Sequence, residues 1–133
     1  MYNKILIGTA LNHRFKDKAL ETAKSLISSN GKIIAVHVIE PVNNVVESFI
    51  SEEVKTKAHE KIKSDLAAHY NDDAIESEIL HGHAGRQITH YAKKIGADCI
   101  IIGSHKPGLE DFFLGSTSSR VVRHSTCSVH VLR

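Results

Sequence analysis

A segment bounded by two glycines contains the residue types of this sequence that could do chemistry. The chain leaves the apolar run Ile100–Ile102 through Gly103 and returns through Gly115 into four consecutive hydroxyl side chains. Glycine lets a backbone come close to a ligand. The first amides of a helix that begins at Ser116 would have no partner within that helix, and such amides bind phosphate. The segment therefore predicts an anion site.

Polar side chains around the same segment could assist. The hydroxyls of Ser116, Thr117 and Ser118 can add hydrogen bonds to an anion, and His105 and Lys106 supply positive or polarisable groups. An alternative stays open at this point, because a serine at a helix start is commonly an ordinary cap without any ligand.

Other nucleotide and catalytic signatures are absent. Gly108 is followed by Leu109 and not by lysine, so the segment is no P-loop, and the sequence holds no G-x-G-x-x-G motif. The serines have no evident base oriented by an acid, and His105 has no obvious nucleophile beside it. The sequence predicts binding, and no catalytic residue.

The elements that must position this segment alternate between strand-like and helix-like patterns. The apolar or alternating runs predict five strands, at Ile5–Ile7, Lys32–Ile39, Ala74–Leu80, Asp98–Gly103 and Ser128–Arg133. Helical spacing predicts a helix over Phe15–Ile27 with Gly31 as its stop, one long helix over Val46–Leu66, a helix over Ile88–Ile95 stopped by Gly96, and a short helix over Ser116–His124.

This order predicts one α/β domain over residues 1–133. Strands joined by helical crossovers run parallel, with right-handed connections and helices on both faces. The strand at Ala74–Leu80 alternates in polarity, which predicts a sheet edge. Ligands of such open sheets bind at the carboxyl ends of the strands, where the winding reverses. Gly103 follows the fourth strand at that edge.

Composition narrows the class of partner. Aromatic residues make up only 5% of the chain and Trp is absent, which disfavours a nucleic-acid platform of stacked rings. Lys plus Arg exceeds Asp plus Glu by 17 − 15 = 2, and this excess is spread along the chain. No apolar run approaches the roughly 18 residues of a membrane span. We therefore expect neither a nucleic-acid nor a membrane partner.

The compartment is predicted from the cysteines and the first residues. Cys99 and Cys127 form no C-x-x-C pair and are typical of the reduced, buried thiols of a cytosolic protein. The opening "MYNKILIGTALNHR" has only a seven-residue apolar stretch and no convincing cleavage site, so we interpret it as a strand and not as a signal peptide.

Ten histidines raise the question of a metal. His81 and His83 are two residues apart and could share an ion only if a third ligand such as His105 converged on them. We predict no metal site. His37 and His130 lie within predicted strands and are expected to be satisfied core or interface side chains.

Four stretches carry a family resemblance: "KILIGTA" from Lys4, "HGHAGRQITHYAKKIGAD" from His81, "IIIGSHKPG" from Ile100 and "FFLGSTSSRVVRHSTCSVHVLR" from Phe112. The chain resembles the universal stress protein family, in its small bacterial type whose loop reads Ser-His-(Arg/Lys)-Pro. The resemblance implies a flavodoxin-like fold with a five-stranded parallel sheet in the order 3-2-1-4-5. It also implies a cytoplasmic location, homodimers joined through the last strand and, in many members, bound ATP.

Carried over by position, the resemblance implies the residues of an ATP site. The phosphates would lie against Gly103, Ser104, His105, Lys106, Gly115, Ser116, Thr117 and Ser118. Adenine and ribose would lie against Thr9, Ala10 and Val38, with Gly82 close to the sugar. AMP or ADP in place of ATP, and an accompanying Mg²⁺, are compatible with the same site.

Three departures from the family pattern concern this site. An Asp often ends the first strand in ATP-binding members, and Ala10 stands there; losing one such hydrogen bond costs about 1–3 kcal/mol of affinity. Lys106 replaces the second glycine of Gly-x2-Gly-x9-Gly-Ser/Thr, and eight residues, not nine, separate it from Gly115. This shorter Lys-Pro version is typical of the subfamily.

The sequence thus predicts a dimeric, stress-responsive protein that binds an adenine nucleotide and regulates without high turnover. Two alternatives remain open from the residues. One is a nucleotide-independent dimeric scaffold, favoured by Ala10 and the missing glycine. The other is a slow ATP-hydrolysing or autophosphorylating enzyme.

Overall fold

A computed structural model describes residues 1–8, 13–104 and 114–133. Its strands are β1 (Tyr2–Ile7), β2 (Ile27–Ile39), β3 (Ile75–His81), β4 (Cys99–Gly103) and β5 (Ser128–Leu132). Its helices are α1 (His13–Leu26), α2 (Asn44–Ser48), α3 (Glu52–His69), α4 (Ala84–Ile95) and α5 (Ser116–His124).

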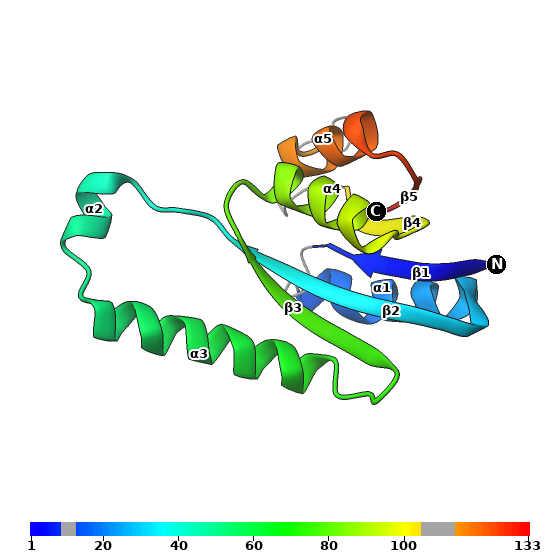
Figure 1. Ribbon diagram of the computed structural model, residues 1–133, viewed down its shortest axis with the longest axis horizontal. Helices are drawn as coiled ribbons and strands as arrows, with labels where there is room; N and C mark the ends of the chain where they lie inside the picture. The colour runs from blue at the N-terminus through cyan, green and yellow to red at the C-terminus, as the bar shows by residue number, and fades with distance from the viewer. Residues whose placement is uncertain (9–12, 105–113) are drawn as a thin grey trace.

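The strands form one parallel sheet in the order β3-β2-β1-β4-β5 (Figure 1). This confirms the predicted α/β fold and its strand order. β3 lies at a sheet edge, as its polarity pattern predicted; its Ile75 is buried, whereas Glu76 and Glu78 are exposed. Because all strands run in one direction, their carboxyl ends meet at the same edge of the sheet.

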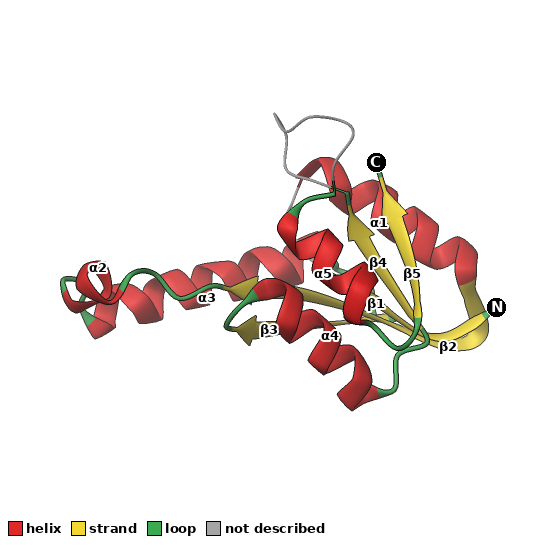
Figure 2. Ribbon diagram, turned by 90° about the horizontal axis from the view of Figure 1, so that it is seen from above, coloured by secondary structure: helices red, strands yellow, loops and turns green. Residues whose placement is uncertain are grey.

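Helices cover both faces of the sheet (Figure 2). On one face, α1 and α3 pack on the side chains of alternate strand positions, including Ile5, Ile7, Ala35 and Ile101. On the other, α4 and α5 cover the intervening positions, including Leu6, Ile34, Ile100 and Ile102. The three isoleucines of β4 are at most 1% exposed, so this strand lies at the centre of both cores.

The start of β2 differs from the prediction. Gly31 does not stop α1, which ends at Leu26; it lies within β2. Tyr2 pairs with Ile27 and Lys4 pairs with Lys32, so two steps along β1 oppose five along β2. A Cβ on Gly31 would lie 2.5 Å from the Ile27 side chain. Glycine therefore permits a tight irregularity in the pairing of β1 with β2. In the sequence alone, a glycine in this position looks the same as one that stops a helix.

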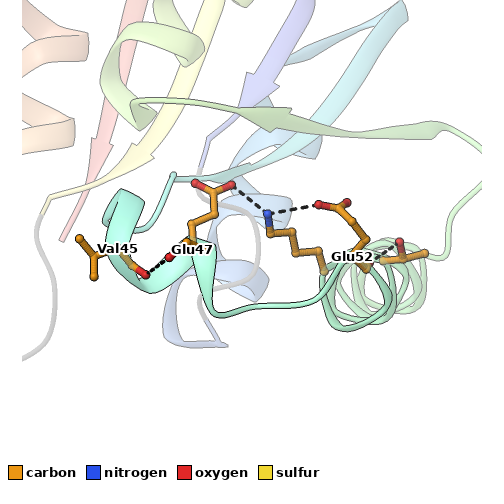
Figure 3. A network of polar contacts seen from close by, with 6 residues as sticks. Val45, Glu47 and Glu52 are labelled. Carbon is orange, nitrogen blue, oxygen red and sulfur yellow. Dashed lines mark hydrogen bonds and ion pairs between the residues drawn. The ribbon is translucent and has the colours of Figure 1, made fainter.

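The predicted long helix over Val46–Leu66 is wrong, because two helices replace it. Ser51 caps the second by accepting a hydrogen bond from the Val54 amide. Lys55 ties the two together, with its Nζ 3.2 Å from the Glu47 carboxylate and 3.5 Å from that of Glu52 (Figure 3).

The apolar stripe of that segment is also mostly uncovered. Only Leu66 of the predicted stripe is buried, whereas Val46 and Val54 are 52% and 56% exposed. Figure 1 shows the reason: α2 and the first turns of α3 extend beyond the sheet that would have to cover them. Periodicity in the sequence identifies the apolar face of a helix. It does not show whether the sheet is long enough to cover that face.

The predicted end of α4 and the predicted bounds of α5 are confirmed. Gly96 ends α4 with a left-handed backbone, φ 72°, as a helix C-cap glycine does. α5 has the predicted bounds. Cys99 and Cys127 are free thiols; Cys99 is buried, which raises its pKa to about 11, and Cys127 is half-buried. No helix in the described part of the chain is long and apolar enough to cross a membrane.

Candidate functional site

The winding of the sheet reverses between β1 and β4. α1 and α3 connect strands toward β3 on one face, whereas α4 and α5 lie on the other face toward β5. The Gly8 amide, just past β1, donates to the Ile101 carbonyl oxygen at 3.0 Å and holds the two strand ends together. A Cβ on Gly8 would lie 3.0 Å from Cδ1 of Ile88, so glycine lets α4 pack closely here. Ligands of open α/β sheets bind at such a point.

Four predicted site residues meet at the carboxyl end of β4. The Ser104 amide donates to the Leu132 carbonyl oxygen at 2.7 Å, and the Gly115 amide donates to that of Ser104 at 2.8 Å. The Ser118 hydroxyl donates to the Gly103 carbonyl oxygen. Ser104 and Ser118 are each 4% exposed. Hydrogen bonds therefore fix the start of α5 against the ends of β4 and β5.

The first turn of α5 presents unused donors. Gly115 is the N-cap and offers no side chain, and the first helical bond runs from the Ser119 amide to the Gly115 carbonyl oxygen. The amides of Ser116, Thr117 and Ser118 have no acceptor among the described residues. Ser116 is exposed and Thr117 half-buried, so this turn is accessible. Free amides and the helix dipole together favour an anion.

The hydroxyls contribute unequally. The Ser118 hydroxyl donates to the Gly103 carbonyl oxygen and so positions the turn. Of Ser118, only the backbone amide is therefore available to a ligand. The Ser119 hydroxyl is directed to the Leu114 carbonyl oxygen at 3.3 Å. Ser116 and Thr117 therefore supply the hydroxyls that could contact a ligand.

A second helix begins at the same edge, but its N-terminus is occupied. The Ala84 amide at the start of α4 donates to a carboxylate oxygen of Glu40 at 3.2 Å. Glu40 directly follows β2, and the sequence interpretation missed it. The sequence feature that could have identified Glu40 is its position as an acidic residue directly after a predicted strand. The next two amides, of Gly85 and Arg86, have no acceptor among the described residues, but the charge of Glu40 at this terminus repels an anion. The α5 start carries no such carboxylate in the described residues, so we assign the anion site to α5.

Val38 and Gly82 form a separate group at the ends of β2 and β3. The Gly82 amide donates to the Ile39 carbonyl oxygen at 3.0 Å, and its φ of 127° favours glycine. Val38 is 8% exposed and packs in the core beneath α4. β1 lies between this group and the end of β4 in the sheet order. Thr9, Ala10, His105 and Lys106 lie outside the described residues.

The histidines depart in part from expectation. The His37 Nδ1 is buried without a hydrogen-bond partner in the described part of the chain, so the expectation that it is satisfied is wrong for this atom; burial lowers the pKa of its imidazole. The rings of His81 and His59 stack with centroids 5.3 Å apart. Within residues 1–8, 13–104 and 114–133, no three His, Cys, Asp or Glu side chains could hold a metal ion together.

A groove of about 410 Å³ opens between α3 and β3. Its lining includes His59, Lys63, Leu66 and Ile79. None of the predicted site residues lines it, and we do not assign the anion site to it.

Comparison with known proteins decides the family. The family model described as "Universal stress protein family" matches residues 1–133. The chain belongs to the universal stress protein family. It is 31% identical to universal stress protein MJ0531 of Methanocaldococcus jannaschii, covering 100% of this chain and 83% of that protein. It is 27% identical to universal stress protein G of Shigella flexneri, over the full length of both.

Solved structures support the universal stress protein fold. The hypothetical protein MJ0577, whose biochemical function was assigned from its structure, has a TM-score of 0.79 and 30% identity, covering 99% of this chain and 96% of that one. Two more distant universal stress proteins were solved with nucleotides. One is in complex with cAMP, at 20% identity and a TM-score of 0.65. The other, from Archaeoglobus fulgidus, is in complex with dAMP, at 18% identity and a TM-score of 0.65.

Proposed function

We propose that this universal stress protein binds an adenine nucleotide, ATP in the first instance, with its phosphates at the N-terminus of α5. The observation that supports this is the contrast between two helix starts at one sheet edge. At the α4 start the Glu40 carboxylate accepts from the first amide, that of Ala84, whereas among the described residues the α5 start has no carboxylate partner and none of its first three amides has an acceptor. Relatives of the same fold bind cAMP and dAMP.

In this proposal, the residues have distinct parts. The amides of Ser116, Thr117 and Ser118 bind phosphate oxygens, and the first two hydroxyls add bonds. Gly103 and Gly115 let the backbone approach the ligand, and Ser104 fixes the turn. His105 and Lys106 supply positive charge; Thr9, Ala10, Val38 and Gly82 contact the nucleoside. AMP or ADP, and Mg²⁺ beside the phosphates, fit the same arrangement.

A charge substitution at the helix start tests the proposal. Ser116→Asp places a carboxylate in the first turn of α5, where it competes with phosphate yet favours the helix through its dipole. We expect isothermal titration to show at least a tenfold loss of affinity for ATP and AMP, while the melting temperature stays equal or rises. Thr126→Asp makes the same charge change at another exposed hydroxyl residue, after the end of α5, and serves as the control.

Either of two results would contradict nucleotide binding at α5. One is the absence of heat with ATP, ADP and AMP up to millimolar concentration, with and without Mg²⁺. The other is a Ser116→Asp protein that binds as tightly as the Thr126→Asp protein.

We further propose a cytoplasmic homodimer, paired through β5, that acts in a stress response as a regulator. β5 is an edge strand of the sheet, and bare edges invite pairing with another chain. His130→Lys puts a charge on an exposed residue of this edge strand, and we expect light scattering to show a folded monomer. The control is Val122→Lys, on the exposed side of α5. A folded His130→Lys dimer would argue against pairing through β5.

A further inference from the structure

Two neighbouring helices of the fold carry positive charge without any negative charge. Neither α4 nor α5 contains an Asp or a Glu. We call their cationic and histidine residues the basic face: Arg86, His90, Lys93, Lys94, Arg120, Arg123 and His124. Five of the 17 Lys and Arg residues of the chain therefore lie on two helices that hold none of its 15 acids.

Helical spacing gathers these side chains on one surface. Arg86, His90 and Lys93 stand at i, i+4 and i+7 on α4, which is the spacing of one helix face. Arg120, Arg123 and His124 stand at i, i+3 and i+4 on α5. All of them are exposed except Arg120, which is half-buried. The core sides are elsewhere, at Ile88, Ala92 and Val121.

The two helices lie side by side, as Figures 1 and 2 show. A Cβ on Gly85 would meet the Cβ and Cδ of Arg120 at 2.9 Å, so the arginine stem passes directly over α4. Both helices connect parallel strands and run in the same direction. With a rise of about 1.5 Å per residue, Arg86 and Lys93 are about 10 Å apart along the axis. The basic face is thus continuous across both helices.

The described residues of the protein do not neutralise this charge. Within the described part of the chain, the side chains of the five Lys and Arg residues of the basic face make no ion pair or hydrogen bond. α3 differs, because there Lys55 pairs with Glu47 and Glu52, and Lys57 pairs with Glu53. The small excess of charge in the sequence is thus uneven in space.

Glu40, Glu76 and Glu78 are acids on the β2 and β3 side of α4. Glu40 binds the Ala84 amide at the helix start. Burial is the main cause that raises the pKa of Tyr91, and the negative charges of Glu78 and Glu76 on β3 raise this pKa further. On the helical wheel Tyr91 lies about 140° from Arg86 and about 160° from Lys93 but about 60° from Lys94, so these two acids border the basic face on its Lys94 side only. Glu110 and Asp111 lie outside the described residues.

Contrary to the expectation from the overall composition, we propose that the basic face binds the phosphate backbone of double-stranded nucleic acid without sequence preference. The protein surfaces that bind DNA are polar and strongly positive, and arginines bind phosphates in a bidentate manner. A protein partner is less well matched, since protein interfaces have an apolar centre. Val122 is the sole large apolar side chain exposed on these two helices in the described residues. The scarcity of aromatics disfavours single strands.

Charge reversal with a matched control tests this. The probe is a fluorescent 20-base-pair DNA duplex of arbitrary sequence, followed by anisotropy. We expect a Kd of about 10⁻⁶–10⁻⁴ M at physiological salt, with a slope of log K against log salt of up to about −4.5 if all five cations contact phosphates. K93E/K94E/R123E should weaken binding at least tenfold. K57E/K61E/K63E, with the same charge change on exposed residues of α3, should not.

Further measurements separate the other outcomes. K93Q/K94Q/R123Q replaces the reversal should that variant not fold, and circular dichroism verifies both. Duplex binding that is equal in the α3 and α4–α5 variants would overturn the proposal. Displacement of the labelled duplex by poly-glutamate as effectively as by unlabelled duplex would overturn it too, because it would show a general attraction to polyanions. Titration with ATP should be unchanged in these variants, which distinguishes this proposal from nucleotide binding at α5.

Discussion

The Ser118 hydroxyl donates a hydrogen bond to the Gly103 carbonyl oxygen and so joins the first turn of α5 to the last residue of β4. Ser118 is 4% exposed. Ser118→Ala leaves this carbonyl without its donor, and we expect a loss of about 1–2 kcal/mol in the free energy of unfolding, measured with urea. Ser116→Ala, at an exposed position, should change it by less than about 0.5 kcal/mol. Equal effects would mean that the bond contributes nothing.

Asp98 fixes the opposite end of the sheet. Its carboxylate accepts hydrogen bonds from the Asn3 and Lys4 amides, each at 2.9 Å, and its own amide donates to the Lys4 carbonyl oxygen at 3.0 Å. Burial raises the pKa of this carboxyl, but the hydrogen bonds from Asn3 and Lys4 outweigh burial, so the pKa lies below its ordinary value.

This pKa predicts a pH-dependent stability. Because the folded pKa is lower than the unfolded one, the contribution of Asp98 is complete above about pH 4 and is lost as the pH falls through the folded pKa. Asp98→Asn should cost about 1–2 kcal/mol of unfolding free energy at pH 7, and the difference should shrink by pH 3. Asp73→Asn, at an exposed site, should show no such trend. A difference that is constant with pH would refute the ionic origin.

Gly85 is required by the close contact of α4 with α5. Alanine in a helix is normally about 1 kcal/mol better than glycine. Here its Cβ would lie 2.9 Å from the Cβ and Cδ of Arg120. We therefore expect Gly85→Ala to lower the unfolding free energy by about 1 kcal/mol. In the Arg120→Ala background the cost should shrink without vanishing, because the Cβ at position 120 remains. A stabilised Gly85→Ala protein would show that the helices separate easily.

Features that depend on neighbouring residues could be predicted from the sequence, whereas contacts between residues far apart in the sequence could not. The bounds of α5 could be predicted, because glycine and hydroxyl residues mark a helix start within a few positions. The contact of Glu40 with the α4 start could not, since Glu40 and Ala84 are 44 positions apart in the sequence. The basic face also depends on which helices become neighbours. The prediction for Gly31 was wrong because glycine after an amphipathic helix is expected both where a helix stops and where a strand pair is irregular.

His37 gives the remaining prediction, because an unpaired polar atom lies in the strand layer. It pairs in register with Ile79 between β2 and β3, and its Nδ1 is buried without a partner in the described residues. Burial lowers the pKa of the imidazole below its ordinary value, so the folded protein takes up a proton less readily than the unfolded chain. The stability is then complete above about pH 6.5 and decreases as the pH falls toward and through the folded pKa.

Replacing His37 with leucine should remove this dependence. We expect urea unfolding of His37→Leu to give a free energy equal to or up to about 1 kcal/mol above that of the unmodified protein at pH 7, because no buried nitrogen remains unpaired. The advantage should grow at pH 5, where the unmodified protein has lost stability by protonation of the unfolded chain. His124→Gln, which removes an exposed imidazole, controls for the loss of a histidine. A His37→Leu protein with an unchanged difference between pH 7 and pH 5 would show that this imidazole is hydrated in solution.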